Sequence, residues 1–121
     1  MSKIMIIDDD LTVTQLLTAL LTMEGHESIT VNDSTQALGL ASTFNPDLIV
    51  LDLMMPGLNG FDLCRLLHQD PRFENIPVLV VSALEDPNSK RRAAEAGARD
   101  YLTKPFNIDD FLQKIIELIG S

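Results

Sequence analysis

Three short runs of almost uninterrupted apolar residues constrain the fold of this 121-residue chain more than any other feature. They cover residues 3–8, 47–52 and 76–82. Such continuous runs are typical of parallel strands that helices cover on both faces, because neither face of the strand then meets water. Two further segments, 27–31 and 100–103, alternate between apolar and polar side chains. We therefore predict three central strands and two edge strands.

Helical patterns separate the predicted strands, so each strand returns to the same sheet through a crossover connection. Right-handed crossovers favour a doubly wound α/β fold, with a flavodoxin-like five-stranded parallel sheet in the order 2-1-3-4-5. In that order the connections change direction between the first and third strands, where ligand sites of such sheets lie. The length of the chain predicts a single domain over residues 1–121.

The predicted helices differ in how well they can pack. Thr12 and Gln15 have the spacing of a capping box at the start of the first helix, and Gly25 is expected to end that helix. A fourth helix over residues 88–96 has only alanines for an apolar stripe, so we expect it to be the most weakly held. The last helix, capped by Asn107, has an apolar stripe at helical spacing and should pack firmly.

Carboxylates end two of the apolar runs. Asp8 and Asp9 follow the first run and Asp52 follows the second. Because the carboxyl ends of these strands meet at the switch point, the three side chains should lie together. At separations of about 4 Å and an effective dielectric constant of about 20, each ionised pair would cost roughly 4 kcal/mol. A cation is therefore expected among them.

Composition excludes several classes of partner. The net charge of −9 argues against binding to nucleic acid or to anionic lipid surfaces. The single cysteine, Cys64, cannot form an internal disulfide, and its helical spacing from apolar residues predicts a small buried core residue. The sequence shows no signal peptide and no apolar segment long enough to span a bilayer, so we predict a cytoplasmic protein with no membrane contact.

Four motifs follow one another along the chain. They read IMIIDDD, LDLMMPGLNG, VLVVSA and YLTKPF, and they extend from the first run to the start of the last helix. Each motif alone is weakly specific, whereas four of them in this order and spacing are strongly specific. With these motifs, essentially the whole chain resembles the receiver domains of two-component response regulators.

The resemblance implies an acidic acceptor site that binds a metal. Asp52 matches the residue that accepts a phosphoryl group, and Asp8 and Asp9 match the acidic pair that holds Mg²⁺. Mg²⁺ prefers hard oxygen ligands and keeps several waters. Asp9, Asp52, the backbone carbonyl of Met54 and a phosphoryl oxygen would suit it, with Asp8 acting through water or by orienting its neighbours.

The resemblance also assigns the residues that respond to the phosphoryl group. Lys104 matches the site lysine and Ser82 the switch hydroxyl, and both can donate hydrogen bonds to phosphoryl oxygens. Tyr101 matches the switch aromatic, which would fill the space that Ser82 leaves as it moves inward. The bond between Lys104 and Pro105 matches a peptide bond that is cis in the family.

We therefore expect a phospho-accepting signalling switch. A histidine kinase or histidine phosphotransfer protein would supply the phosphoryl group, and the chain would be an enzyme only in catalysing its own aspartyl phosphorylation and dephosphorylation. The surface of the fourth helix, fifth strand and fifth helix would then change its contacts with a downstream protein target or an attached output domain. A phosphorylation-dependent homodimer is a further expectation. A stand-alone regulator and a receiver excised from a longer protein both fit the sequence.

Two positions differ from those of many relatives. Met54 and Leu84 lie two residues beyond Asp52 and Ser82, where polar side chains of relatives help to place the hydrolytic water. Both positions are apolar here. The resemblance therefore predicts that the phosphoryl group is lost slowly by hydrolysis, and that the signal lasts longer than in relatives with polar residues there.

Two other functions are alternatives. The run that starts at Asp8 also fits the DxDxT signature of haloacid-dehalogenase-like phosphatases, with Asp8 as nucleophile and Asp10 as acid or base. That family needs a further acidic motif on a strand, whereas Asp109-Asp110 falls inside a helical pattern, and Asp52 would have no role. The second alternative is a receiver-like interaction module that is never phosphorylated. The presence of every residue that phosphorylation needs counts against it.

Overall fold

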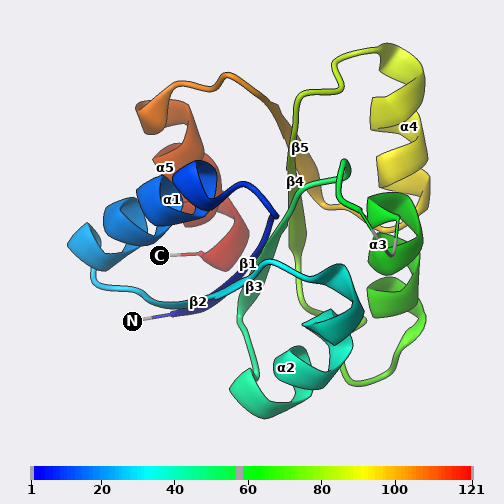
Figure 1. Cartoon of the computed structure of the whole chain (residues 1–121), viewed down its shortest axis with the longest axis horizontal. Helices are drawn as coiled ribbons and strands as arrows, with labels where there is room; N and C mark the ends of the chain where they lie inside the picture. Colours follow the sequence, from blue (N-terminus) through cyan, green and yellow to red (C-terminus); the bar gives the residue numbers. More distant parts are fainter. Residues whose placement is uncertain (1, 57–58, 121) are drawn as a thin grey trace.

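The computed structural model describes residues 2–56 and 59–120, in which strands alternate with helices (Figure 1). In chain order the elements are β1 (Lys3–Ile7), α1 (Leu11–Met23), β2 (Glu27–Val31), the 3-10 helix η1 (Ser34–Gln36), α2 (Ala37–Phe44), β3 (Leu48–Leu51), α3 (Gly60–Gln69), β4 (Val78–Ser82), α4 (Pro87–Glu95), β5 (Asp100–Thr103) and α5 (Ile108–Ile119). Within these residues no helix is long and apolar enough to cross a membrane.

The strands form one parallel sheet in the order β2-β1-β3-β4-β5, which confirms the predicted doubly wound topology. Helices α1 and α5 cover one face of the sheet, and α2, α3 and α4 cover the other (Figure 1). The central strands β1, β3 and β4 are buried along nearly their whole length, whereas β2 and β5 at the edges are partly exposed. Alternating sequences therefore mark the edges, as predicted.

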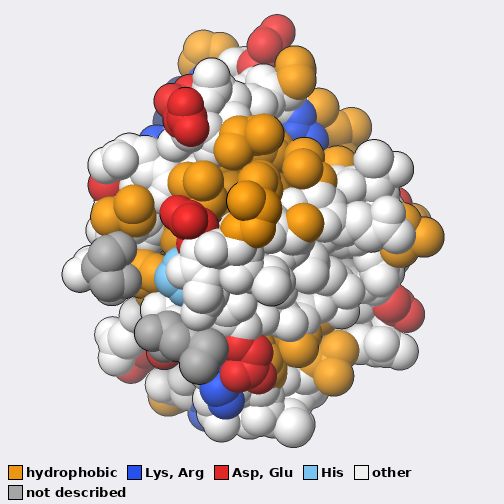
Figure 2. All heavy atoms as spheres, turned by 90° about the vertical axis from the view of Figure 1, so that its left-hand side faces the viewer, with side chains coloured by type: hydrophobic (Ala, Val, Ile, Leu, Met, Phe, Trp, Pro, Cys, Tyr) orange, Lys and Arg blue, Asp and Glu red, His pale blue; other side chains and the backbone are white. Residues whose placement is uncertain are grey.

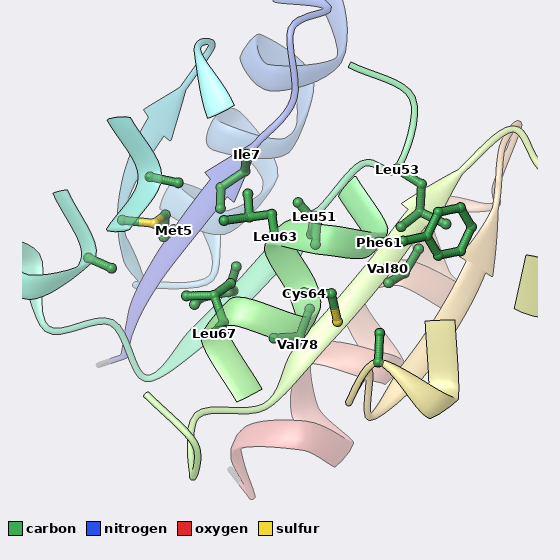
Figure 3. Packing of buried hydrophobic residues seen from close by; sticks show 14 of the residues in the cluster. Met5, Ile7, Leu51, Leu53, Phe61, Leu63, Cys64, Leu67, Val78 and Val80 are labelled. Atoms are coloured by element: carbon green, nitrogen blue, oxygen red, sulfur yellow. The ribbon is translucent and has the colours of Figure 1, made fainter. Parts of the chain in front are cut away.

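Each face of the sheet has its own hydrophobic core, because successive side chains of a strand point to opposite faces. Met5 of β1 packs on the side of α2, α3 and α4, where Leu63 and Cys64 of α3 meet the strands (Figure 3). Ile6 of β1 packs on the other side, in the cluster that contains Phe111 of α5. Cys64 is fully buried, as predicted, and this burial raises its pKa to about 11.

The central strands are shorter than predicted. β1 and β3 end one residue before Asp8 and Asp52, and β4 starts at Val78 instead of Ile76. Pro77 has no N–H to donate to a neighbouring strand, which explains the late start of β4. Asp8 and Asp52 therefore lie just beyond the carboxyl edge of the sheet, outside the regular alternation of side chains between its two faces.

The cap of the first helix also differs from the prediction. Helix α1 is capped by Asp10, and Thr12 is already its second residue, so the predicted capping box is wrong. Asp10 Oδ1 accepts hydrogen bonds from the backbone N–H groups of Thr12 (2.9 Å) and Val13 (3.3 Å). An ionised carboxylate satisfies two free N–H groups here and interacts favourably with the positive end of the helix dipole. Gly25, with φ 82°, follows the helix as expected.

Helices α4 and α5 pack to different extents. The buried side chains of α4 are the small Ser89 and Ala93, which is consistent with a weakly held helix. In α5, Phe111 is fully buried, but Ile108 is 46% and Ile116 is 45% exposed. The prediction of firm packing is therefore only partly right, because the apolar stripe is wider than the contact that α5 makes with the sheet.

Candidate functional site

Three carboxylates meet at the carboxyl edge of the sheet, between β1 and β3. Ile7 and Leu51 are partners in the register of these two strands, so the residues that follow them leave the sheet side by side. Carboxylate oxygens of Asp8, Asp9 and Asp52 all lie within 4.8 Å of one another. Asp8 and Asp52 are buried, and Asp9 is exposed. The structure thus brings together the acids that the sequence places at the switch point.

Lys104 brings a positive charge to this cluster. Its Nζ donates a hydrogen bond of 2.8 Å to Asp8 Oδ2 and lies 3.6 Å from Asp52 Oδ2. Lys104 follows β5, and its backbone N–H donates to the carbonyl of Ser82 at the end of β4 (2.8 Å). The peptide bond between Lys104 and Pro105 is cis. Lys104 therefore reaches the acids from the β5 side of the sheet, past the end of β4.

Burial and neighbouring charges shift the pKa values of both groups. Burial raises the pKa of the Asp52 carboxyl, the hydrogen bond from the Met54 N–H opposes this, and the charge of Asp8 adds to it, so the pKa is raised. Burial acts to lower the pKa of Lys104, but its hydrogen bond to Asp8 and the charges of Asp52 and Asp8 outweigh burial and raise it. The surroundings of Asp52 thus disfavour its negative charge, which a bound divalent cation would offset.

The donor set fits a small divalent cation. In the described part of the chain the cluster offers one carboxylate oxygen from each of three acids, with no histidine or cysteine among them. Hard oxygen ligands of this kind are those that Mg²⁺ prefers. Met54, whose carbonyl is the further predicted ligand, lies in the loop after β3, where its N–H donates to Asp52 Oδ1 (3.2 Å). The residues present therefore suit Mg²⁺, with Asp8, Asp9 and Asp52 around it.

The backbone of Asp52 is approached closely by the start of α3. A Cβ placed on Gly60 would lie 2.4 Å from Leu53 Cα and 2.8 Å from the carbonyl oxygen of Asp52. A glycine lets the helix start against this backbone, because it has no Cβ. Gly60 carries no functional signal in the sequence, since nothing in the local pattern distinguishes it from a turn glycine.

Asn32, just after β2, is a second residue that contacts the cluster without a signal in the sequence. Its side-chain Nδ2 donates a hydrogen bond of 2.9 Å to the backbone carbonyl of Asp8. The Asp8 N–H donates to the carbonyl of Val31 (3.1 Å), and Asp8 Oδ1 accepts from the N–H of Asp10 (2.9 Å). Asn-Asp after a strand is a common turn signal, so the sequence gives no sign that this side chain reaches the acidic cluster.

The two predicted switch residues are linked through the backbone of Leu84. The Ser82 side chain is fully buried, and its Oγ accepts a hydrogen bond from the Leu84 N–H (3.3 Å). The Tyr101 hydroxyl donates to the Leu84 carbonyl (2.5 Å), and burial raises the pKa of Tyr101. Lys90 of α4 places its Nζ 5.7 Å from the centre of the Tyr101 ring. Tyr101 of β5 is therefore joined to the loop after β4, and its ring is also contacted by α4.

Comparison with known proteins decides the family. The model for the response regulator receiver domain matches residues 4–116, nearly the whole chain. The chain belongs to this family. The resemblance seen in the four motifs is thus confirmed.

This receiver domain is 40% identical over 119 residues to the DNA-binding dual master transcriptional regulator RpaA of Synechocystis. The match covers 98% of this chain but 49% of RpaA, so the chain spans about half the length of that relative. The receiver domain of the Francisella response regulator 1452 has 34% identity and a TM-score of 0.91, with 99% of this chain and 98% of that chain covered.

A further solved structure contains a metal. The receiver domain of a Pseudomonas aeruginosa sensor histidine kinase, described with a magnesium ion coordinated in its active site cleft, is 25% identical to this receiver domain. Its TM-score is 0.90, and the match covers 99% of this chain and 98% of that one. The likeness extends across the whole sheet and its helices, which is the scaffold that places the acids.

Proposed function

We propose that this receiver domain accepts a phosphoryl group on Asp52, from a histidine kinase or histidine phosphotransfer protein, in a reaction that depends on Mg²⁺. The observation that carries the proposal is the cluster of Asp8, Asp9 and Asp52 with Lys104 Nζ at 2.8 Å from Asp8 and 3.6 Å from Asp52. The buried Asp52 carboxylate thus lies beside the ammonium group of Lys104 and within a set of carboxylates that could bind a metal cation. A carboxylate needs such screening before it can approach a phosphoryl group.

In the proposed reaction an Asp52 carboxylate oxygen attacks phosphorus. The new O–P bond forms while the P–N bond of the phosphohistidine breaks, and the imidazole nitrogen keeps the electron pair and takes up a proton. Lys104 would hold the transferred group through its ammonium, with the Ser82 hydroxyl as a second donor. Asp8, Asp9, Asp52 and the carbonyl of Met54 would hold Mg²⁺, as the magnesium-bound relative supports. Bound Mg²⁺ would supply positive charge that offsets the repulsion between carboxylate and phosphoryl group.

An apolar groove beside the site supports docking of a protein donor. It has a volume of about 400 Å³ and lies against Lys104 and the start of α1. Figure 2 looks onto the face that carries α1 and α5 and shows a hydrophobic patch in the upper half of the view, with acidic side chains on one side of it and basic side chains on the other. The groove is lined by Val13, Leu16, Ala83, Lys104, Pro105, Phe106 and Ile108. A donor that covers this groove would bring its phosphohistidine close to Asp52.

Output would follow from the link between Ser82, Leu84 and Tyr101. Movement of Ser82 toward the phosphoryl group would disturb the hydrogen bond that its Oγ accepts from Leu84, and with it the loop that Tyr101 holds. The surface of α4, β5 and α5 would then change its contacts with a downstream target or an attached output domain, or with a second copy of the chain. Catalysis by the domain would be limited to its own phosphorylation and dephosphorylation.

Two further properties belong to the proposal. Met54 and Leu84 are apolar at positions where a polar side chain would place the hydrolytic water, which supports slow dephosphorylation. The single buried cysteine supports a reducing compartment, and we place the protein in the cytoplasm.

The test is phosphorylation by a small acyl phosphate with Mg²⁺, read by intact-protein mass and by lability in base. We expect one phosphoryl group on the parent protein and none on Asp52→Asn. Asp10→Asn is the matched control, because asparagine also caps helices and Asp10 lies outside the three-acid cluster; it should be labelled like the parent.

The outcomes separate the candidate functions. Label on Asp8 in place of Asp52 would support the phosphatase-like alternative, although Asp109 and Asp110 lie in the first turn of α5 and not on a strand. A parent protein that no donor labels would instead support the interaction module that is never phosphorylated.

A further inference from the structure

The contact between Asn32 and Asp8 replaces a missing rung of the sheet. β1 and β2 pair in parallel with Lys3 opposite Glu27 and Ile7 opposite Val31. At the two ends of this pair, the N–H of Glu27 donates to the carbonyl of Ser2 and the N–H of Asp8 donates to the carbonyl of Val31. In a regular parallel ladder the donors of one strand recur at every second residue. The next donor to the Asp8 carbonyl would therefore be the N–H of residue 33.

The chain turns away before it can make that rung. β2 ends at Val31, and Asp33 is the cap of η1, where its side chain accepts from the N–H of Thr35 (3.0 Å). The side-chain amide of Asn32 lies 2.9 Å from the Asp8 carbonyl oxygen instead. A side-chain N–H thus takes the place of the backbone N–H, and the Asp8 carbonyl keeps its hydrogen bond after the strand has ended.

This hydrogen bond acts on the peptide that joins the two acids. The Asp8 carbonyl and the Asp9 N–H belong to one planar unit, so a bond to the carbonyl limits rotation of that plane. Asp8 is already fixed by its side chain, which accepts from Asp10 N and from Lys104 Nζ. Asp9 is exposed, and its carboxylate forms no hydrogen bond or ion pair with another residue in the described part of the chain. The direction of the Asp9 carboxylate therefore depends on how its backbone is held.

We propose that Asn32 is a positioning residue for the cation site: its amide holds the Asp8–Asp9 peptide so that the Asp9 carboxylate faces Asp8 and Asp52 before the cation binds. The inference rests on the proposed Mg²⁺ binding but not on phosphorylation. Asn32 contacts the site through the backbone carbonyl of Asp8 and not through a carboxylate oxygen, so it would act on the cation only through the Asp8–Asp9 peptide. Removing its donor should lower Mg²⁺ affinity without unfolding the domain.

The test compares variants that differ at this one donor. Asn32→Leu has nearly the same size without an N–H, Asn32→Ala removes the side chain, and Asn32→Gln keeps a donor on a longer stem. Thr35→Val is the matched control, because it removes the hydrogen bond from Thr35 Oγ1 to Asp33 (2.6 Å) in the same loop but leaves the contact with Asp8. Asn32 is exposed, so its replacement should be tolerated by the fold.

Two measurements distinguish an effect of Asn32 on the position of Asp9 from a general loss of stability of the domain. Mg²⁺ titration followed by the amide NMR signals of residues 8–10 should show about tenfold weaker binding in Asn32→Leu and Asn32→Ala, since contacts behind metal ligands commonly have effects of this size. Asn32→Gln should recover part of the loss, and Thr35→Val should bind like the parent. In the metal-free protein, the Asp9 amide should exchange faster in Asn32→Leu than in Thr35→Val.

Mg²⁺ affinity in Asn32→Leu and Asn32→Ala equal to that of the parent would overturn the inference, as would an equal loss in Thr35→Val. Because binding is measured without a phosphodonor, the result does not depend on whether Asp52 is labelled. A parent that binds Mg²⁺ but accepts no phosphoryl group would contradict the proposed function and leave this inference standing.

Discussion

Lys104 forms its shorter contact with Asp8 and not with Asp52. Its Nζ is 2.8 Å from Asp8 Oδ2 and 3.6 Å from Asp52 Oδ2, and the Lys104 side chain is 18% exposed. Asp8 thus forms a direct ion pair, while Asp52 Oδ1 accepts a hydrogen bond from the Met54 N–H. The lysine charge stabilises the cluster mainly through Asp8.

Replacing Lys104 should therefore destabilise the metal-free domain. Lys104→Gln removes the charge beside a buried carboxylate, and we expect a loss of about 1–3 kcal/mol in the free energy of unfolding. Urea unfolding in chelator measures it, and Mg²⁺ should restore part of the loss. Lys114→Gln is the control, because Lys114 pairs with the more exposed Asp100 at 2.9 Å and should lose less than about 1 kcal/mol. Equal losses in the two variants would contradict the role assigned to Lys104.

Asp52→Asn should stabilise the metal-free domain at neutral pH. Burial raises the pKa of Asp52 above its ordinary value of 3.8, so folding favours the protonated acid. Protonated Asp52 therefore contributes fully to the free energy of unfolding below pH 3.8, and this contribution is lost as pH rises through the raised pKa. The variant lacks this loss, so its melting temperature in chelator should exceed that of the parent at pH 7, and the difference should shrink as pH falls toward 3.8.

Added Mg²⁺ gives the check on that prediction. The parent should gain more stability from Mg²⁺ than Asp52→Asn does, because the amide is a weaker ligand than the carboxylate. If the variant is less stable than the parent in chelator at pH 7, the folded protein does not disfavour the ionised form of Asp52, and the prediction is wrong.

Gly60→Ala should disturb the acceptor through the backbone. The added Cβ would lie 2.4 Å from Leu53 Cα, so either α3 or the backbone after β3 must move, at a cost of about 1–3 kcal/mol. Gly39→Ala in α2 is the control: a Cβ there meets nothing within 4 Å, and alanine should stabilise the helix by about 0.5–1 kcal/mol. Urea unfolding compares the two. Opposite signs are expected, and a neutral Gly60→Ala would contradict the close approach.

The switch prediction concerns amide exchange far from Asp52. Beryllofluoride or phosphoryl binding should change exchange in residues 82–96 and at Tyr101, while the centre of the sheet stays protected. Ser82→Ala should allow phosphorylation but reduce the change at Tyr101, because it removes the hydroxyl that bonds Leu84. Ser42→Ala, at an exposed position of α2, should respond like the parent.

A full response at Tyr101 in Ser82→Ala would contradict the route through the hydroxyl. Another contact that leads to α4 is made by Arg92, whose guanidinium lies 4.0 Å from the centre of the Phe61 ring. Phe61 follows Gly60, which lies against the backbone of Asp52. In that case Arg92→Gln, which removes the cation above the ring, should reduce the response instead.

Local patterns in the sequence were sufficient to predict the strands and the acids that meet at the switch point. Continuous apolar runs identified the central strands, alternation identified β2 and β5, and acids at the ends of two neighbouring strands identified the switch point. These are local patterns, and the topology then follows from the handedness of crossovers. For the same reason the clustering of Asp8, Asp9 and Asp52 was predictable, since it needs only the strand order.

Which groups touch could be learned only from the tertiary structure. Lys104 lies closer to Asp8 than to Asp52, the Asn32 side chain bonds the Asp8 carbonyl after β2 has ended, and Gly60 lies against the backbone of Asp52. None of these contacts lies within one helix or strand, and at these separations a shift of one ångström changes the partner. The distances between these groups depend on where each loop leaves the sheet and on how the helices pack against it. No local pattern of residues contains that information.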